Sequence, residues 1–200
     1  MNTAVHRAQE LNAFISIAAP AAIGEGPRVA VKDLVDVAGC VTTGGGRVFP
    51  LVPAARDAPL IARLRDAGCC FVGKTNLDEF AYGALGANEH FGDMHHPHAR
   101  DRIAGGSSGG SAIAVAVGAA DWAIGTDTGG SIRIPAGLCG VVGFKPTLGT
   151  IDRTGVVLLS ETLDTVGALA PDVRTAARAV EQMSGRDRGL PTEAPALTGM

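Results

Sequence analysis

The feature that most constrains this chain is residues 105–137, where two glycine- and serine-rich turns flank an apolar run of small residues. The first turn reads GGSSGGS over 105–111, and the second reads DTGGS over 127–131. Glycine permits backbone conformations and close approaches that other residues forbid. Because apolar residues flank both turns, we expect the turns to be buried and to present backbone amides and serine hydroxyls to a ligand. The alternative, a flexible Gly/Ser linker, is disfavoured by the same apolar surroundings.

This stretch resembles the amidase signature family of serine hydrolases. The matching motifs are GGSSGGSA at 105–112 and GTDTGGSIRIPA at 125–136, together with VAVKD around Lys32 and GKTNLDEFAYG at 73–83. The resemblance covers about residues 10 to 185 and keeps the motifs in the family's order. It implies an α/β fold with a mixed sheet between helix layers. It also implies an amidase that cleaves a carboxylic amide through a seryl acyl-enzyme.

The resemblance implies catalytic roles for three residues of this sequence. Ser131 would be the acylated nucleophile, and Ser107, which would follow a cis peptide bond from Gly106, would bridge it to a base. Lys32 would be that general base. A serine hydroxyl is a weak nucleophile until a base takes its proton, and a lysine can take it if burial makes the amine neutral near pH 7. On spacing alone, Lys32 would be interpreted as a solvated strand end.

Amide hydrolysis also needs donors that stabilise an oxyanion, and the second glycine turn offers backbone amides for this purpose. Its glycines let a carbonyl approach without meeting a side chain. The expected donors are the amides of Thr128, Gly129, Gly130 and Ser131. We interpret Asp127 and Arg133, which flank the nucleophile with opposite charges, as an ion pair that fixes the turn, with Ser108 as further support.

Two other motifs point to different functions. GGSSG at 105–109 satisfies the nucleophile-elbow pattern GxSxG, but no histidine follows His98, and an elbow triad needs one. GCCFVGKT at 68–75 matches the phosphate-binding pattern GxxxxGK[ST], but its middle residues are apolar and β-prone, and a helical segment precedes it. Neither an elbow triad nor a nucleotide site is therefore expected.

The loop over 85–104 is rich in histidine, which raises the question of a metal site. It holds Asp93 and the histidines His90, His95, His96 and His98. The spacing of these residues is not that of a helical zinc motif, and a long loop near active turns is more often the wall of a substrate cleft. We expect neither a metal nor any other cofactor.

Composition excludes several classes of partner. The net charge is −3 with no block of like charges, so nucleic-acid binding is not expected. The longest apolar run, 112–120, is too short to span a membrane, and the first 14 residues lack the apolar core of a secretory signal. The four cysteines are Cys40, Cys69, Cys70 and Cys139, and no CxxC pair occurs among them. Free thiols are therefore expected, which indicates a cytoplasmic protein.

Periodicity and turn residues predict the remaining elements. Asp57 is expected to cap a helix that carries Leu60, Ile61 and Leu64 and ends at Gly68. Further helices are predicted over 4–17, 108–119 and 172–184, and one more is expected to start at Thr75 or Asn76 and to run through LDEFAYGAL. The predicted strands are 28–32, 69–72, 121–126, 140–145 and 163–170. Residues 41–56 are a predicted loop. We expect residues 1–186 to form the N-terminal part of an amidase domain and residues 187–200 to form a loose tail.

Members of the family resemble a single domain of more than twice this length. The sheet is therefore expected to be truncated, with an open edge that requires a complementary C-terminal amidase chain or a second copy of this chain. Two alternatives to a small-molecule amidase stay open. One is the A subunit of glutamyl-tRNA(Gln) amidotransferase, a family member that releases ammonia from glutamine. The other is a non-catalytic interaction module.

Overall fold

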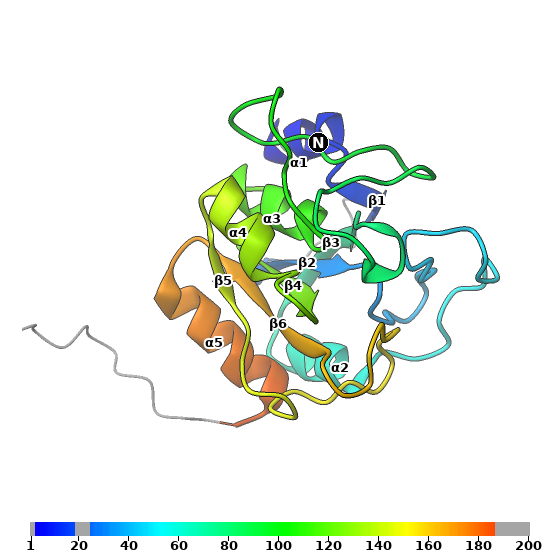
Figure 1. Cartoon of the computed structure of the whole chain (residues 1–200). Helices are drawn as coiled ribbons and strands as arrows, with labels where there is room; N and C mark the ends of the chain where they lie inside the picture. Colours follow the sequence, from blue (N-terminus) through cyan, green and yellow to red (C-terminus); the bar gives the residue numbers. More distant parts are fainter. Residues whose placement is uncertain (1–2, 19–24, 187–200) are drawn as a thin grey trace, which may run out of the picture.

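A six-stranded mixed sheet forms the centre of the fold (Figure 1). The computed structural model describes residues 3–18 and 25–186, so the predicted tail at 187–200 lies outside the described residues. Across the sheet the strands are β1 (Phe14–Ile17), β3 (Cys70–Thr75), β2 (Arg28–Lys32), β4 (Trp122–Asp127), β6 (Thr165–Ala170) and β5 (Val142–Phe144). β2 is parallel to both of its neighbours, and the other pairs are antiparallel.

Helices cover both faces of this sheet (Figure 1). α2 (Pro59–Asp66) and α5 (Val173–Ser184) lie on one face, and α1 (Thr3–Glu10), α3 (Gly109–Ala116) and α4 (Arg133–Cys139) lie on the other. Successive residues of a strand point to opposite faces. Accordingly, Val29 and Val31 belong to the core beneath α2 and α5, whereas Ala30 belongs to the core beneath α3. The expected α/β class, with a mixed sheet between helix layers, is confirmed.

The core beneath α3 depends on small residues, because the helix lies very close to neighbouring backbone. A Cβ added at Gly110 would lie 2.4 Å from the carbonyl oxygen of Ala13 and 2.6 Å from that of Asn76. Glycine is therefore required at this position of α3. The close packing sets the start of α3, and with it the turn that carries Ser107, against the ends of β3 and β4.

The predicted helix over 4–17 is wrong in its second half. α1 ends at Glu10, Asn12 has a left-handed φ of 55°, and the chain then enters β1. β1 pairs antiparallel with β3, with Phe14 opposite Thr75. The FISI segment is rich in β-prone residues, and the hydrogen bonds offered by β3 outweigh its helical spacing.

Two further local predictions are wrong, because the Asp57 carboxylate and the Phe80 N–H make tertiary contacts instead of the expected helical ones. Asp57 does not cap α2; its carboxylate accepts from the backbone of Ala38 at 2.7 Å and from Arg65 Nε at 2.6 Å. The predicted helix after Thr75 is a single 3₁₀ turn, η2 (Glu79–Ala81). Its Phe80 has a left-handed φ of 49° and donates its N–H to the carbonyl of Gly44 at 2.7 Å.

The other predicted elements agree with the structure to within a few residues. The strands at 28–32, 121–126, 140–145 and 163–170 correspond to β2, β4, β5 and β6, and the strand at 69–72 extends to Thr75 as β3. The helix at 108–119 corresponds to α3, and that at 172–184 corresponds to α5, whose cap Asp172 accepts from Thr175 N at 2.8 Å. Within the described ranges, no helix is long and apolar enough to cross a membrane.

Candidate active site

The candidate site lies where the carboxyl ends of β2 and β4 meet the turn before α3. Lys32 is the last residue of β2, and Asp127 is the last residue of β4. Because the two strands are parallel neighbours, their carboxyl ends lie at the same edge of the sheet. The turn that ends in Ser107 and Ser108 packs against this edge, since Ser108 Oγ donates to the carbonyl of Thr126 at 3.2 Å.

Lys32 is fully buried, and its amine makes two hydrogen bonds to hydroxyl groups. Its Nζ donates to Ser107 Oγ at 2.7 Å and to Thr126 Oγ1 at 2.8 Å. Burial disfavours the charged amine and lowers the pKa of Lys32 to about 7, although the negative charges of Asp78, Asp164 and Asp127 oppose this shift. A substantial fraction of the amine is therefore neutral near pH 7 and able to accept a proton.

The first glycine turn contributes two buried serines with different contacts. The peptide bond between Gly106 and Ser107 is cis, as the resemblance implies. Ser107 accepts the hydrogen bond from Lys32. Ser108 exchanges hydrogen bonds with the backbone of Thr126, and its own N–H donates to the carbonyl of Ser131 at 3.0 Å. Ser108 thus ties the first turn to β4 and to the second turn.

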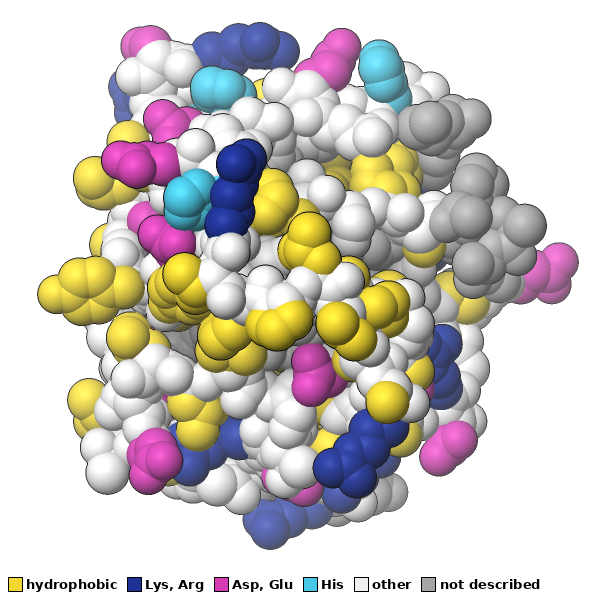
Figure 2. Space-filling model, turned by 90° about the vertical axis from the view of Figure 1, so that its right-hand side faces the viewer, with side chains coloured by type: hydrophobic (Ala, Val, Ile, Leu, Met, Phe, Trp, Pro, Cys, Tyr) yellow, Lys and Arg dark blue, Asp and Glu magenta, His cyan; other side chains and the backbone are white. Residues whose placement is uncertain are grey.

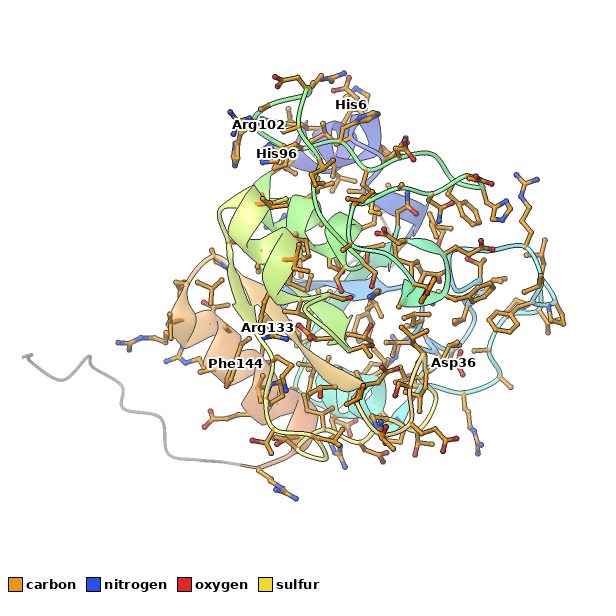
Figure 3. All side chains as sticks on the ribbon, in the orientation of Figure 1. His6, Asp36, His96, Arg102, Arg133 and Phe144 are labelled. Carbon is orange, nitrogen blue, oxygen red and sulfur yellow. The ribbon has the colours of Figure 1, made fainter. Side chains whose placement is uncertain are left out.

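The second glycine turn is organised by the carboxylate of Asp127. This buried carboxylate accepts the N–H of Gly130 at 2.8 Å and that of Ile132 at 3.1 Å, and it pairs with Arg133 Nη2 at 2.9 Å. Burial acts to raise the pKa of Asp127, but the hydrogen bonds and charge of Arg133 and the two backbone donors outweigh it and leave the pKa below its ordinary value. Figure 3 shows Arg133 at the start of α4, beside the sheet.

The hydrogen bonds of this turn engage one of the four expected oxyanion donors and leave the other three without an acceptor in the described part of the chain. Gly130 donates its N–H to Asp127, so this amide is already engaged. In contrast, the N–H groups of Thr128, Gly129 and Ser131 donate to no group in the described part of the chain. A Cβ added at Gly129 would meet nothing within 4 Å, so this side of the turn is open to an approaching carbonyl. The structure therefore leaves three free amides where the sequence suggested four.

One link of the implied relay is not present as a hydrogen bond. Ser131 is 8% exposed, and its carbonyl accepts the N–H of Ser108 in the first turn. The described residues, however, contain no hydrogen bond between the hydroxyl of Ser131 and that of Ser107. Sequence reasoning also missed three residues around the lysine: Thr126, which accepts from Lys32, and the carboxylates of Asp78 and Asp164. Thr126 and Asp78 lie inside the motifs at 125–136 and 73–83, but their spacing along the chain does not indicate that they act on Lys32.

The competing motifs serve other contacts in the structure. Lys74 of the phosphate-binding pattern lies within β3, where its Nζ pairs with the buried Asp33 at 2.7 Å. His96 Nε2 lies 2.8 Å from the carbonyl of Leu138, and His98 Nε2 lies 3.2 Å from that of Cys139. Both histidines therefore hold the end of α4, away from Arg133 at its start (Figure 3).

The chain belongs to the amidase family, because the family model described as Amidase matches residues 1–198. It is 42% identical to the A subunit of a glutamyl-tRNA(Gln) amidotransferase from Syntrophobacter fumaroxidans, over 89% of this chain and 40% of the relative. It is also 46% identical to AtzE, a component of 1-carboxybiuret hydrolase from a Pseudomonas species, over 79% of this chain and 35% of the relative.

Solved structures agree with this assignment. A crystal structure of an amidase superposes with a TM-score of 0.85 at 40% identity, over 92% of this chain and 47% of that one. The A subunit of the glutamyl-tRNA(Gln) amidotransferase from Thermotoga maritima superposes with a TM-score of 0.85 at 39% identity, over 92% of this chain and 43% of that one. The chain thus spans less than half the length of the relatives that it matches.

Proposed function

We propose that this chain carries the catalytic residues of an amidase that hydrolyses a carboxylic amide to an acid and ammonia or an amine. The observation that carries the proposal is the buried amine of Lys32, with a pKa of about 7, hydrogen-bonded to Ser107 beside the turn of Ser131. A base poised near the working pH is what proton transfer from a serine requires. Membership of the amidase family supports the same reaction.

In the proposed first half-reaction, Ser131 Oγ attacks the carbonyl carbon of the amide. Its proton passes to Ser107 Oγ while the proton of Ser107 passes to Lys32 Nζ, so the relay stores one proton as the lysine ammonium. The free amides of Thr128, Gly129 and Ser131 stabilise the oxyanion of the tetrahedral intermediate. When the C–N bond breaks, the stored proton returns through Ser107 to the leaving nitrogen and leaves an acyl ester on Ser131.

The second half-reaction removes this acyl group with water. Lys32 and Ser107 take a proton from the water molecule as its oxygen attacks the ester carbon. Collapse of the second intermediate breaks the bond to Ser131 Oγ, which regains the proton and releases the acid. No metal or cofactor takes part in the proposed steps.

The names of the relatives favour a second candidate function. Several of them are A subunits of glutamyl-tRNA(Gln) amidotransferase, so a glutaminase-type role, with glutamine as the amide, is the second candidate. A non-catalytic interaction module is a third, which the intact set of catalytic residues disfavours.

We further propose a cytoplasmic location, which the four free thiols support, and no direct contact with nucleic acid or membrane.

The surface supports the proposal of a protein partner. The loop over 47–53 exposes Val48, Leu51 and Val52, at 74%, 76% and 68% of their surface. Figure 2 shows hydrophobic side chains gathered on the side of the molecule that carries this loop. Exposed apolar surface of this kind marks interaction sites. We propose that a complementary C-terminal amidase chain, or a second copy of this chain, covers it.

Labelling with a serine-directed fluorophosphonate tests the catalytic proposal. Attack by Ser131 Oγ would form a P–O bond and expel fluoride, while the proton of Ser131 passes through Ser107 to Lys32. We expect a single phosphonyl adduct on the peptide that contains Ser131 and none in Ser131→Ala, as read by mass spectrometry. A folded chain that takes no label, alone or with a complementary amidase segment, would favour the non-catalytic module.

A further inference from the structure

Asp78 is a buried carboxylate that the proposed mechanism does not use. It lies three residues beyond the end of β3 and is 4% exposed. Its carboxylate accepts the N–H of Leu85 at 3.2 Å and the N–H of Gly86, which lies 3.1 Å and 3.2 Å from its two oxygens. These contacts anchor the segment that follows η2.

The other side of the Asp78 carboxylate lies against the first glycine turn. A Cβ added at Gly106 would lie only 2.0 Å from Asp78 Oδ1, and one added at Gly83 would lie 2.2 Å from Oδ2. The N–H of Gly106 donates to the carbonyl of Ala84 at 2.9 Å, so the same two backbone segments are joined directly. The Asp78 carboxylate is therefore enclosed between the backbone at Gly83 and the backbone at Gly106, the residue directly before Ser107.

The charge of Asp78 acts on Lys32. Burial lowers the pKa of Lys32, and among the charges that oppose this shift Asp78 has the largest effect, ahead of Asp164 and Asp127. Asp127 has its own counter-ion in Arg133, whereas within the described ranges no lysine, arginine or histidine forms an ion pair with Asp78. A buried carboxylate without a counter-ion is costly, so Asp78 benefits from a nearby cation.

These contacts define a role that rests on the proposed amidase function. We infer that Asp78 is a positioning residue for amide hydrolysis: its carboxylate fixes the backbone that carries Ser107, and its charge favours the protonated form of Lys32. The ammonium form holds the proton that must be delivered to the leaving nitrogen. Asp78 thus supports the stage of the reaction in which Lys32 acts as an acid.

Asp78→Asn tests this role because asparagine keeps the shape of the side chain and removes its charge. Its single carbonyl oxygen can still accept the N–H groups of Leu85 and Gly86. The matched control is Asp93→Asn, because Asp93 also accepts a backbone N–H, from Asn88 at 2.9 Å, but is exposed and is not among the charges that act on Lys32.

Two measurements are made on the whole chain. The first is the pH profile of fluorophosphonate labelling: we expect Asp78→Asn to shift the acid limb to lower pH and to reduce the plateau rate about tenfold or more. The second is an NMR titration of ¹³C-labelled lysine side chains. The chain's only lysines are Lys32, Lys74 and Lys145, so the signal of Lys32 is assigned by its loss in Lys32→Met. We expect its titration midpoint to fall in Asp78→Asn.

The two measurements separate this inference from the proposed function. If the wild-type chain takes no label, the amidase proposal fails for the isolated chain, but the titration of Lys32 still decides the effect of Asp78. If Asp78→Asn does not fold, Gly83→Ala replaces it, because its Cβ would displace the same carboxylate from outside the catalytic turn. A midpoint for Lys32 and a labelling profile that match those of Asp93→Asn would overturn the inference.

Discussion

Lys32 Nζ lies 2.7 Å from Ser107 Oγ, although 75 residues separate the two along the chain. β2 delivers the lysine and the turn before α3 delivers the serine, and neither position is exposed to solvent. The pair combines a proton acceptor with a pKa of about 7 and a hydroxyl that can relay a proton. The pH dependence of any reaction at Ser131 is expected to follow from that contact.

Labelling of Ser131 should depend on pH through Lys32. The base acts in its neutral form and its pKa is about 7, so the labelling rate should rise as pH increases through about 7 and then reach a plateau. Lys32→Ala should lower the rate about 100-fold or more at pH 7. Lys32→Arg should do no better, because the guanidinium stays protonated. An unchanged rate in Lys32→Ala would remove this residue from the mechanism.

Removal of the Asp127 carboxylate should damage both stability and reactivity. Asp127→Ala leaves the N–H groups of Gly130 and Ile132 without their acceptor, at a cost of about 1–3 kcal/mol for each buried donor. Because the turn also loses its shape, we expect labelling of Ser131 to fall about 100-fold. Urea unfolding and labelling at pH 8 measure the two effects.

The control for Asp127 is Asp121→Ala, which removes a partly exposed ion pair with Arg28 together with the carboxylate that accepts the N–H of Arg28 at 2.8 Å. Exposed pairs contribute about 0–1 kcal/mol, so this variant should unfold near the wild-type urea concentration and label at the wild-type rate. Equal losses in the two variants would mean that Asp127 has no special role in the turn.

Glycine should be required at one helical position and replaceable at another. Gly110→Ala would place a Cβ 2.4 Å from the carbonyl oxygen of Ala13, and we expect it to lower the free energy of unfolding by about 1–3 kcal/mol or more. Gly137→Ala in α4 meets nothing within 4 Å and should stabilise the chain by about 0.5–1 kcal/mol. Urea unfolding of both variants checks the contrast, and equal effects would contradict the close packing of α3.

A complementary amidase segment should improve both the behaviour and the activity of this chain. The exposed apolar side chains of the loop over 47–53 require a cover, as does the outer edge of β5, which pairs with no further strand among the described residues. We therefore expect the isolated chain to be oligomeric or poorly soluble and to hydrolyse amides weakly. Co-expression with the C-terminal part of an amidase should raise solubility and rate, as measured by size-exclusion chromatography and an ammonia-release assay. A monomer with full turnover by itself would contradict this prediction.

The motifs of the amino-acid sequence were enough to predict the family, the α/β class and the residues expected to react. Long motifs around Lys32, Ser107 and Ser131 carry that information because each motif is continuous along the chain. Local rules also predicted the strand over 28–32 and the helix over 172–184, since their apolar spacing agrees with the final packing, although spacing alone would have left the end of the strand at Lys32 solvated.

Contacts between distant segments, in contrast, set which groups surround the lysine and which amides of the second turn stay free among the described residues. Thr126 accepts a hydrogen bond from Lys32, and the charge of Asp78 raises the pKa of Lys32, because parallel strands and packed loops bring distant segments together, and no local pattern encodes that arrangement. Likewise, the N–H of Gly130 is taken by Asp127, a choice set by the turn's three-dimensional shape. β1 is a strand for the same reason, because hydrogen bonds to β3, formed across the fold, outweigh the helical spacing that continues from α1 into the β-prone residues Phe14–Ile17.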